Sequence, residues 1–86
     1  MGTTELLISK LQRQLSYHEY IRTNKWWFTH IDRIQEDYSF LNIGANIIAE
    51  IGGEDVNCIV KDFILWDGIL VETDYGNVYY YETKKL

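Results

Sequence analysis

The chain has 86 residues, of which 47% are hydrophobic and 15% aromatic, and its formal net charge at pH 7 is −5. A chain of this length supports one domain with one modest core, and the apolar content excludes a disordered chain. No run reaches the roughly 18 apolar residues that cross a membrane as a helix, so we expect no membrane association.

The acidic charge lies in the C-terminal half of the chain. Residues 1–43 contain five basic and five acidic residues, whereas residues 44–86 contain three basic and eight acidic residues. A surface of this kind repels a nucleic-acid backbone and attracts a basic protein surface. The alternative is that the acidity only keeps a small protein soluble.

The single cysteine, Cys58, cannot form an internal disulfide. Small secreted domains usually carry several cysteines, and the first residues lack the apolar block and cleavage site of a secretory signal. We therefore expect a cytoplasmic protein.

Residues 3–22 have the pattern of an amphipathic helix. Leu7, Leu11 and Leu15 recur at helical spacing, and Thr3 can cap the N-terminus. The apolar stripe predicts that this helix packs on a sheet, since the opposite face is not basic enough for a membrane surface.

Residues 25–34 fit two patterns. Trp27, Ile31 and Ile34 follow a helical period, whereas Trp27, Thr29 and Ile31 alternate as on one face of a strand. The local abundance of aromatic and β-branched residues favours the strand, which is the structure we predict here.

Residues 41–51 alternate as a strand with one buried face. The inward side chains are predicted to be Leu41, Ile43, Ala45, Ile47, Ala49 and Ile51. A glycine at position 44 interrupts the run, and Gly44 predicts a bend or a bulge.

Residues 56–66 form the next predicted strand. Cys58 and Val60 share one parity, and Phe63 and Leu65 share the other. This change of phase predicts a bulge or a corner near residues 61–62.

Two hairpins follow. The dipeptide Asp67-Gly68 is a hairpin signal, and residues 69–73 form the strand after it. The sequence DYGN then forms a turn in which Gly76 supplies a positive φ, and residues 78–82 complete the pattern.

The expected fold class is α+β. Residues 1–86 form a single domain, with an N-terminal amphipathic helix at 3–22 packed on a small antiparallel barrel of five or six short strands over about residues 26–83. Short strands with turns every ~8–12 residues are typical of such a barrel.

Residues 43–81 resemble the SH3-like barrels and, within them, the Tudor group. The resemblance is carried by Gly44, Ala49, the strand around Cys58–Val60, Val71 and the run Asp74-Tyr75-Gly76-Asn77. It implies an SH3-like β-barrel in which Tyr75 and Asn77 match an aromatic cage for methylated lysine or arginine. Asn57 and Cys58 stand where a second aromatic residue is usual, so the resemblance extends to the barrel and leaves the ligand open.

No set of residues indicates catalysis, a metal site or a cofactor. Cys58 has no histidine near it in sequence and has the parity of a small core residue. His18 and His30 lack a cysteine or an acid at metal-ligand spacing. We therefore expect neither an enzyme nor a cofactor-binding protein.

The pattern favours a non-catalytic protein-interaction module. Neighbouring strand residues face opposite sides, so one of Trp26 and Trp27, and one or two of Tyr79–Tyr81, can be exposed and anchor an interface. The alternative is that both faces are buried, one by the core and the other by the N-terminal helix. The candidate contact residues are Trp26, Asp67, Glu72, Asp74, Tyr75, Asn77, Tyr79 and Tyr81. We expect a protein partner with a basic surface and no direct binding of nucleic acid, and self-association stays open.

One version of this function is a small accessory or inhibitor protein of a phage or mobile element. It would occlude a basic host surface, such as the DNA-binding groove of a nuclease, as anti-CRISPR proteins and DNA mimics do, by steric and electrostatic means. The alternative is an SH3-like or Tudor-like barrel that binds nucleic acid or a modified peptide.

Overall fold

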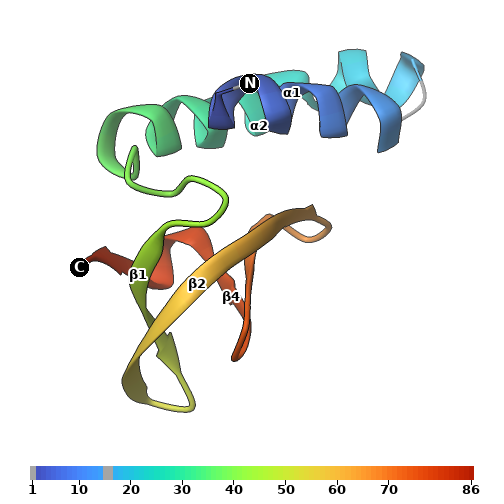
Figure 1. Ribbon diagram of the computed structural model, residues 1–86. Helices are drawn as coiled ribbons and strands as arrows, with labels where there is room; N and C mark the ends of the chain where they lie inside the picture. The colour runs from blue at the N-terminus through green and yellow to red at the C-terminus, as the bar shows by residue number, and fades with distance from the viewer. Residues whose placement is uncertain (1, 15–16) are drawn as a thin grey trace.

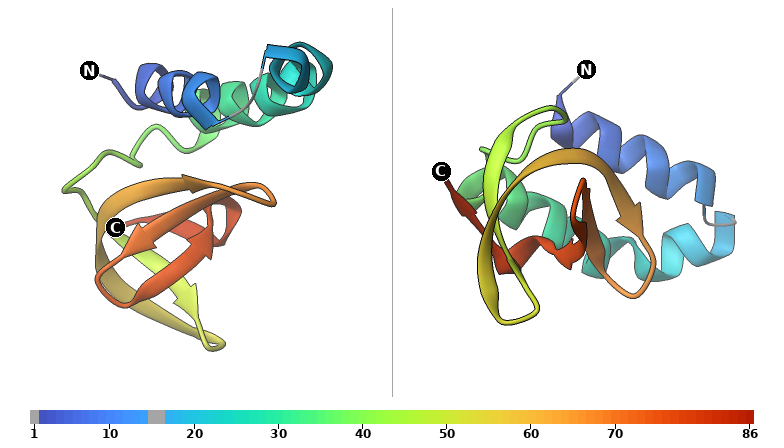
Figure 2. Two further views of the ribbon diagram at one scale, coloured as in Figure 1. Left: turned by 90° about the vertical axis from the view of Figure 1, so that its right-hand side faces the viewer. Right: turned by 60° about the horizontal axis from the view of Figure 1, so that its bottom comes forward.

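The computed structural model describes residues 2–14 and 17–86, and the side chains of residues 2–14 and 25–86. Over this part of the chain it has two N-terminal helices followed by a five-stranded antiparallel sheet. The helices run side by side as one layer, and the bent, twisted sheet forms a second layer (Figures 1 and 2). The predicted α+β class is confirmed.

The helices are α1 (Thr3–Gln14) and α2 (Tyr17–Asp37). The single helix predicted over residues 3–22 thus covers α1 and the start of α2, and its residues 15–16 lie outside the described residues. The strand predicted over residues 25–34 is wrong, because this segment lies within α2.

Packing decides the conformation of α2. Trp27, Ile31 and Ile34 are buried at a helical spacing, and they face the sheet as one stripe. Thr29, which a strand would have placed beside Trp27 and Ile31, is exposed, and its hydroxyl donates a hydrogen bond of 2.8 Å to the Lys25 carbonyl one turn earlier. The burial of three large side chains outweighs the local β propensity.

The strands follow the order β4-β3-β2-β1-β5. Their bounds are β1 (Asn46–Ile51), β2 (Glu54–Leu65), β3 (Ile69–Thr73), β4 (Gly76–Tyr79) and β5 (Thr83–Lys85), and a 3-10 turn, η1 (Tyr80–Glu82), separates the last two. Since one short turn joins the two outermost strands, the sheet must curl around its own core, as Figure 2 shows.

The long strand β2 carries the predicted change of phase. Its pairing with β3 shifts register between Val60 and Asp62. The shift confirms the expected bulge, and it lets Cys58 and Val60, and then Phe63 and Leu65, all point into the core.

A second bulge lies directly before β1. The Gly44 amide donates to the Val60 carbonyl at 2.8 Å, and the Val60 amide donates to the Ala45 carbonyl at 3.0 Å. Two residues therefore oppose one, and Gly44 has φ +89°, which a residue with a side chain rarely adopts. The predicted bend is confirmed, but Ile43 lies before the strand and is 55% exposed, so its inward placement was wrong.

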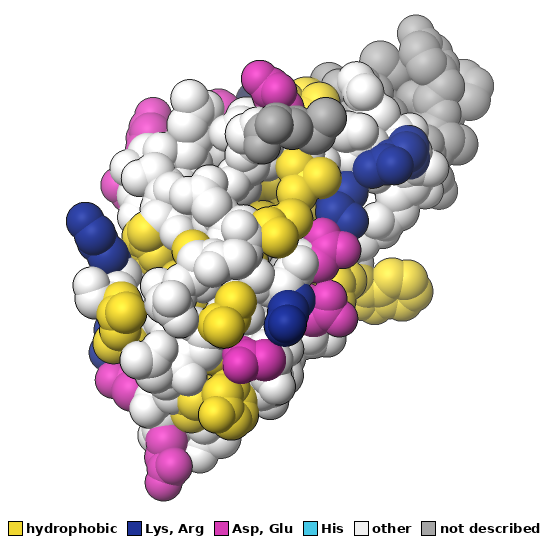
Figure 3. All heavy atoms as spheres, in the orientation of Figure 1, with side chains coloured by type: hydrophobic (Ala, Val, Ile, Leu, Met, Phe, Trp, Pro, Cys, Tyr) yellow, Lys and Arg dark blue, Asp and Glu magenta, His cyan; other side chains and the backbone are white. Residues whose placement is uncertain are grey.

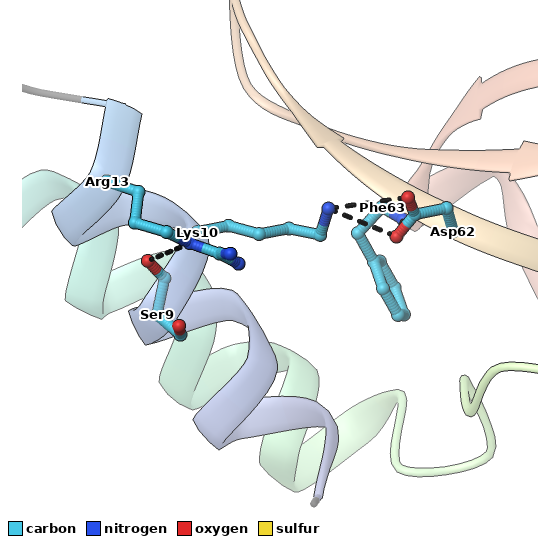
Figure 4. Close-up of polar contacts among 5 residues, drawn as sticks. All are labelled: Ser9, Lys10, Arg13, Asp62 and Phe63. Carbon is cyan, nitrogen blue, oxygen red and sulfur yellow. Dashed lines mark hydrogen bonds and ion pairs between the residues drawn. The ribbon is translucent and has the colours of Figure 1, made fainter.

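Both layers share one hydrophobic core, to which α1 contributes Leu7 and Leu11. Polar contacts join α1 to the rest of the molecule along its length. The Thr3 hydroxyl donates to the Leu41 carbonyl at 2.8 Å, and Lys10 reaches across to Asp62 on β2 with an N···O distance of 3.2 Å (Figure 4). The helical layer is thus held by apolar packing and by directed contacts.

The core position of Ile31 is open to a direct test. Ile31→Ala should lower the free energy of unfolding by about 3 kcal/mol, because a fully buried side chain is removed and a cavity remains. Ile43→Ala is the matched control and should change it by less than about 0.5 kcal/mol. Urea unfolding followed by circular dichroism measures both, and an equal effect of the two variants would contradict this packing.

Candidate functional site

The eight candidate contact residues divide into two groups at opposite ends of β3. Glu72, Asp74, Tyr75 and Asn77 lie at the β3–β4 turn, whereas Trp26, Asp67, Tyr79 and Tyr81 surround a hollow beside the β2–β3 hairpin. A strand of this length separates its ends by about 15 Å, at ~3.3 Å per residue. The residues that we predicted as one contact surface therefore belong to two separate surfaces.

The β3–β4 turn uses its polar groups to hold its own shape. The buried Thr73 hydroxyl donates to the Gly76 carbonyl at 2.7 Å and accepts from the amides of Tyr75 and Gly76, each at 3.1 Å. One Asp74 oxygen accepts the Ile59 amide at 2.8 Å, which ties the turn to β2. Asp74 is thus partly a structural residue.

Tyr75 is 64% exposed at this turn. Among the side chains that the structure describes, no second ring packs beside it. The aromatic cage that the Tudor resemblance implies at Tyr75 and Asn77 would need several ring faces, and they are not assembled there.

The other group forms what we call the aromatic hollow, with a volume of about 210 Å³. Helix α2, the β2–β3 hairpin, the end of β4 and the turn η1 all contribute to its wall. Its lining residues are Trp26, His30, Asp67, Gly68, Ile69, Tyr79, Tyr80 and Tyr81. Four of the eight predicted contact residues therefore meet here.

Two tyrosines form one wall of the aromatic hollow. The rings of Tyr79 and Tyr81 are stacked, with centroids 5.2 Å apart and planes 12° from parallel. The Tyr79 ring also lies against the hairpin, since a Cβ added at Gly68 would stand 3.1 Å from its Cε1 atom. A glycine at this position allows both the close approach and a φ of +132°.

Trp26 lines the aromatic hollow from α2. Its ring lies 4.6 Å from that of His30 and 4.8 Å from that of Trp27, measured between centroids. Trp27 is buried and Trp26 is 49% exposed, while Tyr81 is 54% exposed and Tyr80 is buried. Of the two alternatives that the sequence left open, the structure therefore has the one with exposed aromatic residues.

Tyr80 closes the base of the aromatic hollow. Its hydroxyl lies 2.7 Å from Nδ1 of His30, which connects η1 to α2. Burial raises the pKa of the Tyr80 phenol, and the positive charge of Arg33 opposes this rise.

Among the described lining residues, Asp67 supplies the only carboxylate, and none is a lysine or arginine. Within the described part of the molecule, Asp67 has no ion-pair partner, whereas Asp62 pairs with Lys10 and Asp55 with Lys84. An exposed carboxylate without a partner, beside apolar ring faces, attracts a cation.

Trp66 is the exposed aromatic residue that the sequence reasoning missed. It was assigned to the end of a strand, but it lies in the β2–β3 loop, donates its amide to the Gly68 carbonyl at 3.0 Å and is 79% exposed. The loop between Leu65 and Ile69 includes Trp66 as well as the predicted turn residues Asp67 and Gly68, so Trp66 lies outside the sheet.

A separate groove of about 440 Å³ runs between α1 and β2. Its charged side chains include Lys10 and Asp62, which pair with each other. This groove is therefore a seam between the two layers, and Arg13, which also lines it, donates from Nε to the Ser9 carbonyl at 3.3 Å.

Cys58 and the two histidines were the side chains considered for chemistry. Cys58 is buried, and burial raises the pKa of its thiol. The side chain of His18 lies outside the described residues. Over residues with described side chains, no three histidine, cysteine, aspartate or glutamate residues converge as metal ligands, and no described helix has the length and apolar character needed to span a bilayer.

Comparison of the chain with protein-family models, with curated proteins and with solved structures gives no match. The resemblance to SH3-like barrels therefore stays a prediction, and functional inference rests on the residues and geometry above.

The burial of Cys58 predicts slow thiol chemistry. At pH 8 the folded protein should react with an aromatic disulfide reagent roughly 100-fold more slowly than the urea-unfolded chain, since reaction requires opening of the core. Absorbance of the released thiolate measures both rates. Equal rates would show that this thiol is accessible.

The raised pKa of Tyr80 predicts a loss of stability at alkaline pH. The folded protein holds this proton more tightly than the unfolded chain does, so the contribution is complete below about pH 10 and is lost as the pH rises further. Tyr80→Phe should therefore flatten the fall in the free energy of unfolding between about pH 9 and 11. Identical alkaline profiles for Tyr80→Phe and the parent would refute the assignment.

Proposed function

We propose that this protein is a non-catalytic interaction module that binds a basic surface of a partner protein through the aromatic hollow. The observation that supports this most directly is the convergence of the half-exposed rings of Trp26 and Tyr81 with the carboxylate of Asp67. Exposed tryptophan and tyrosine side chains in a concave site are typical of the energetic centres of protein interfaces.

Charge favours a protein partner over a nucleic acid. Aromatic platforms that stack on bases normally lie in a basic groove that follows the phosphates, and none of the lining residues that the structure describes is a lysine or arginine. On the face shown in Figure 3, basic and acidic side chains are interspersed, so this face does not carry a continuous basic stripe. The net charge of −5 adds to the repulsion of a polyanion.

Occlusion of a basic host surface is the version of this function that we favour. The bent antiparallel sheet supports a resemblance to SH3-like barrels, which would serve here as a rigid frame for the aromatic hollow. A cytoplasmic site of action, expected from the single cysteine, and an origin in a phage or mobile element belong to the same proposal.

The test compares two exposed tyrosines at opposite ends of β3. The partner is first captured from lysate and purified, and its affinity is then measured by calorimetry. Tyr81→Ala and Trp26→Ala should each weaken binding by about 30-fold, as expected at an interface hot spot. Tyr75→Ala, the matched control, should change it by less than about threefold.

Two results would refute the proposal. One is a larger effect of Tyr75→Ala, or of Glu72→Lys combined with Asp74→Lys, than of Tyr81→Ala, which would place the interface at the β3–β4 turn. The other is binding of an oligonucleotide that weakens with salt as phosphate contacts require, which would favour a nucleic-acid-binding barrel. Circular dichroism of each variant controls for folding.

A further inference from the structure

We infer that the aromatic hollow accepts the guanidinium group of one arginine side chain of the partner. This inference rests on the proposed function and makes it more specific. It is argued from the size of the aromatic hollow, from its rings and from the position of Asp67.

The size of the aromatic hollow matches one inserted side chain. Its volume of about 210 Å³ lies below the ~300–1,000 Å³ that is usual for small-molecule sites. The residues around it come from three separate segments of the chain, one in α2, one at the β2–β3 hairpin and one at the end of β4 and in η1.

The walls offer ring faces to a cation. Trp26 and Tyr81 are both about half exposed, and their side chains belong to the same lining. A cation within about 6 Å of an indole or phenol ring is attracted by the electron-rich face. A guanidinium group is flat and weakly hydrated, so it stacks on such rings more readily than a lysine ammonium does.

Asp67 distinguishes arginine from a fully methylated lysine. A carboxylate accepts two parallel N–H bonds from a guanidinium group, whereas a trimethylammonium group has no N–H to donate. In the described part of the chain, Asp67 is not engaged in an ion pair. One exposed carboxylate at the edge of a ring-lined hollow therefore favours a ligand that both stacks and donates.

The charges already present leave room for this ligand. Arg33 acts on the Tyr80 hydroxyl at the base but is not part of the lining. His30 is engaged with the same hydroxyl. Neither side chain pairs with Asp67, so an incoming arginine would meet an acceptor that these two groups do not occupy.

The experiment is a ¹H–¹⁵N NMR titration at pH 7 with N-acetyl-arginine methylamide. We expect saturable shifts at the Trp26 indole N–H and the Gly68 amide, with a dissociation constant in the millimolar range. The citrulline analogue has the same shape without the charge and should bind at least about tenfold more weakly. The trimethyllysine analogue should also bind more weakly.

Three variants test whether the ligand binds in the aromatic hollow. Trp26→Leu and Asp67→Asn should each weaken arginine binding by about fivefold or more. Trp66→Leu removes a more exposed tryptophan that is not in the lining and should leave the affinity unchanged.

Two outcomes overturn the inference. Equal binding of arginine and citrulline would show that the positive charge does not contribute to binding. Tighter binding of trimethyllysine that Asp67→Asn does not change would show that the ligand is a methylated lysine instead. If either occurs while Tyr81→Ala still weakens binding of the purified partner, only the inference of a guanidinium ligand fails. If Tyr81→Ala has no effect on the partner either, the proposed function fails with it.

Discussion

The hydrogen bond between the buried Tyr80 and the half-buried His30 sets the geometry on which the candidate site depends. A phenol hydroxyl in the core needs a partner, because an unpaired one loses its hydration without compensation. His30 supplies that partner from α2, which fixes where α2 crosses the end of the sheet. Trp26 lies one helical turn before His30 and on the same face. It is therefore brought over Tyr79 and Tyr81, the outward neighbours of Tyr80.

The strands were predictable because their signals are local. The alternation of Cys58 and Val60, followed by the opposite parity of Phe63 and Leu65, requires a bulge wherever one face stays buried, and the bulge is present. The segment 25–34 differs, because Trp27 and Ile31 fit the helix and the strand equally. What decides between them is contact with core residues far along the chain, and no local pattern contains that information.

The candidate site was predictable in its parts but not in its assembly. Exposure of one tryptophan and of Tyr81 followed from the simple rule that adjacent side chains cannot all face the core. On α2 the rule still holds, because adjacent helical residues point about 100° apart. Trp26 meets Asp67 and Tyr81 because α2 packs on the sheet. The sequence analysis predicted a strand over residues 25–34, so this helix packing was not foreseen. Trp66 was missed for a similar reason, since its assignment to a strand concealed its place in a loop.

The net charge alone is a weak guide to where a partner binds, because several carboxylates serve the fold. Asp62 and Asp55 are in ion pairs, and Asp74 and Glu82 accept backbone amides. Asp67 has no such partner among the described residues, and it is exposed beside the rings of the aromatic hollow. A carboxylate that is not engaged within the fold is available to a cationic ligand, so Asp67 can contribute more to binding a cation than the carboxylates that are already engaged. The site is thus defined by the coincidence of an unpaired charge with apolar walls.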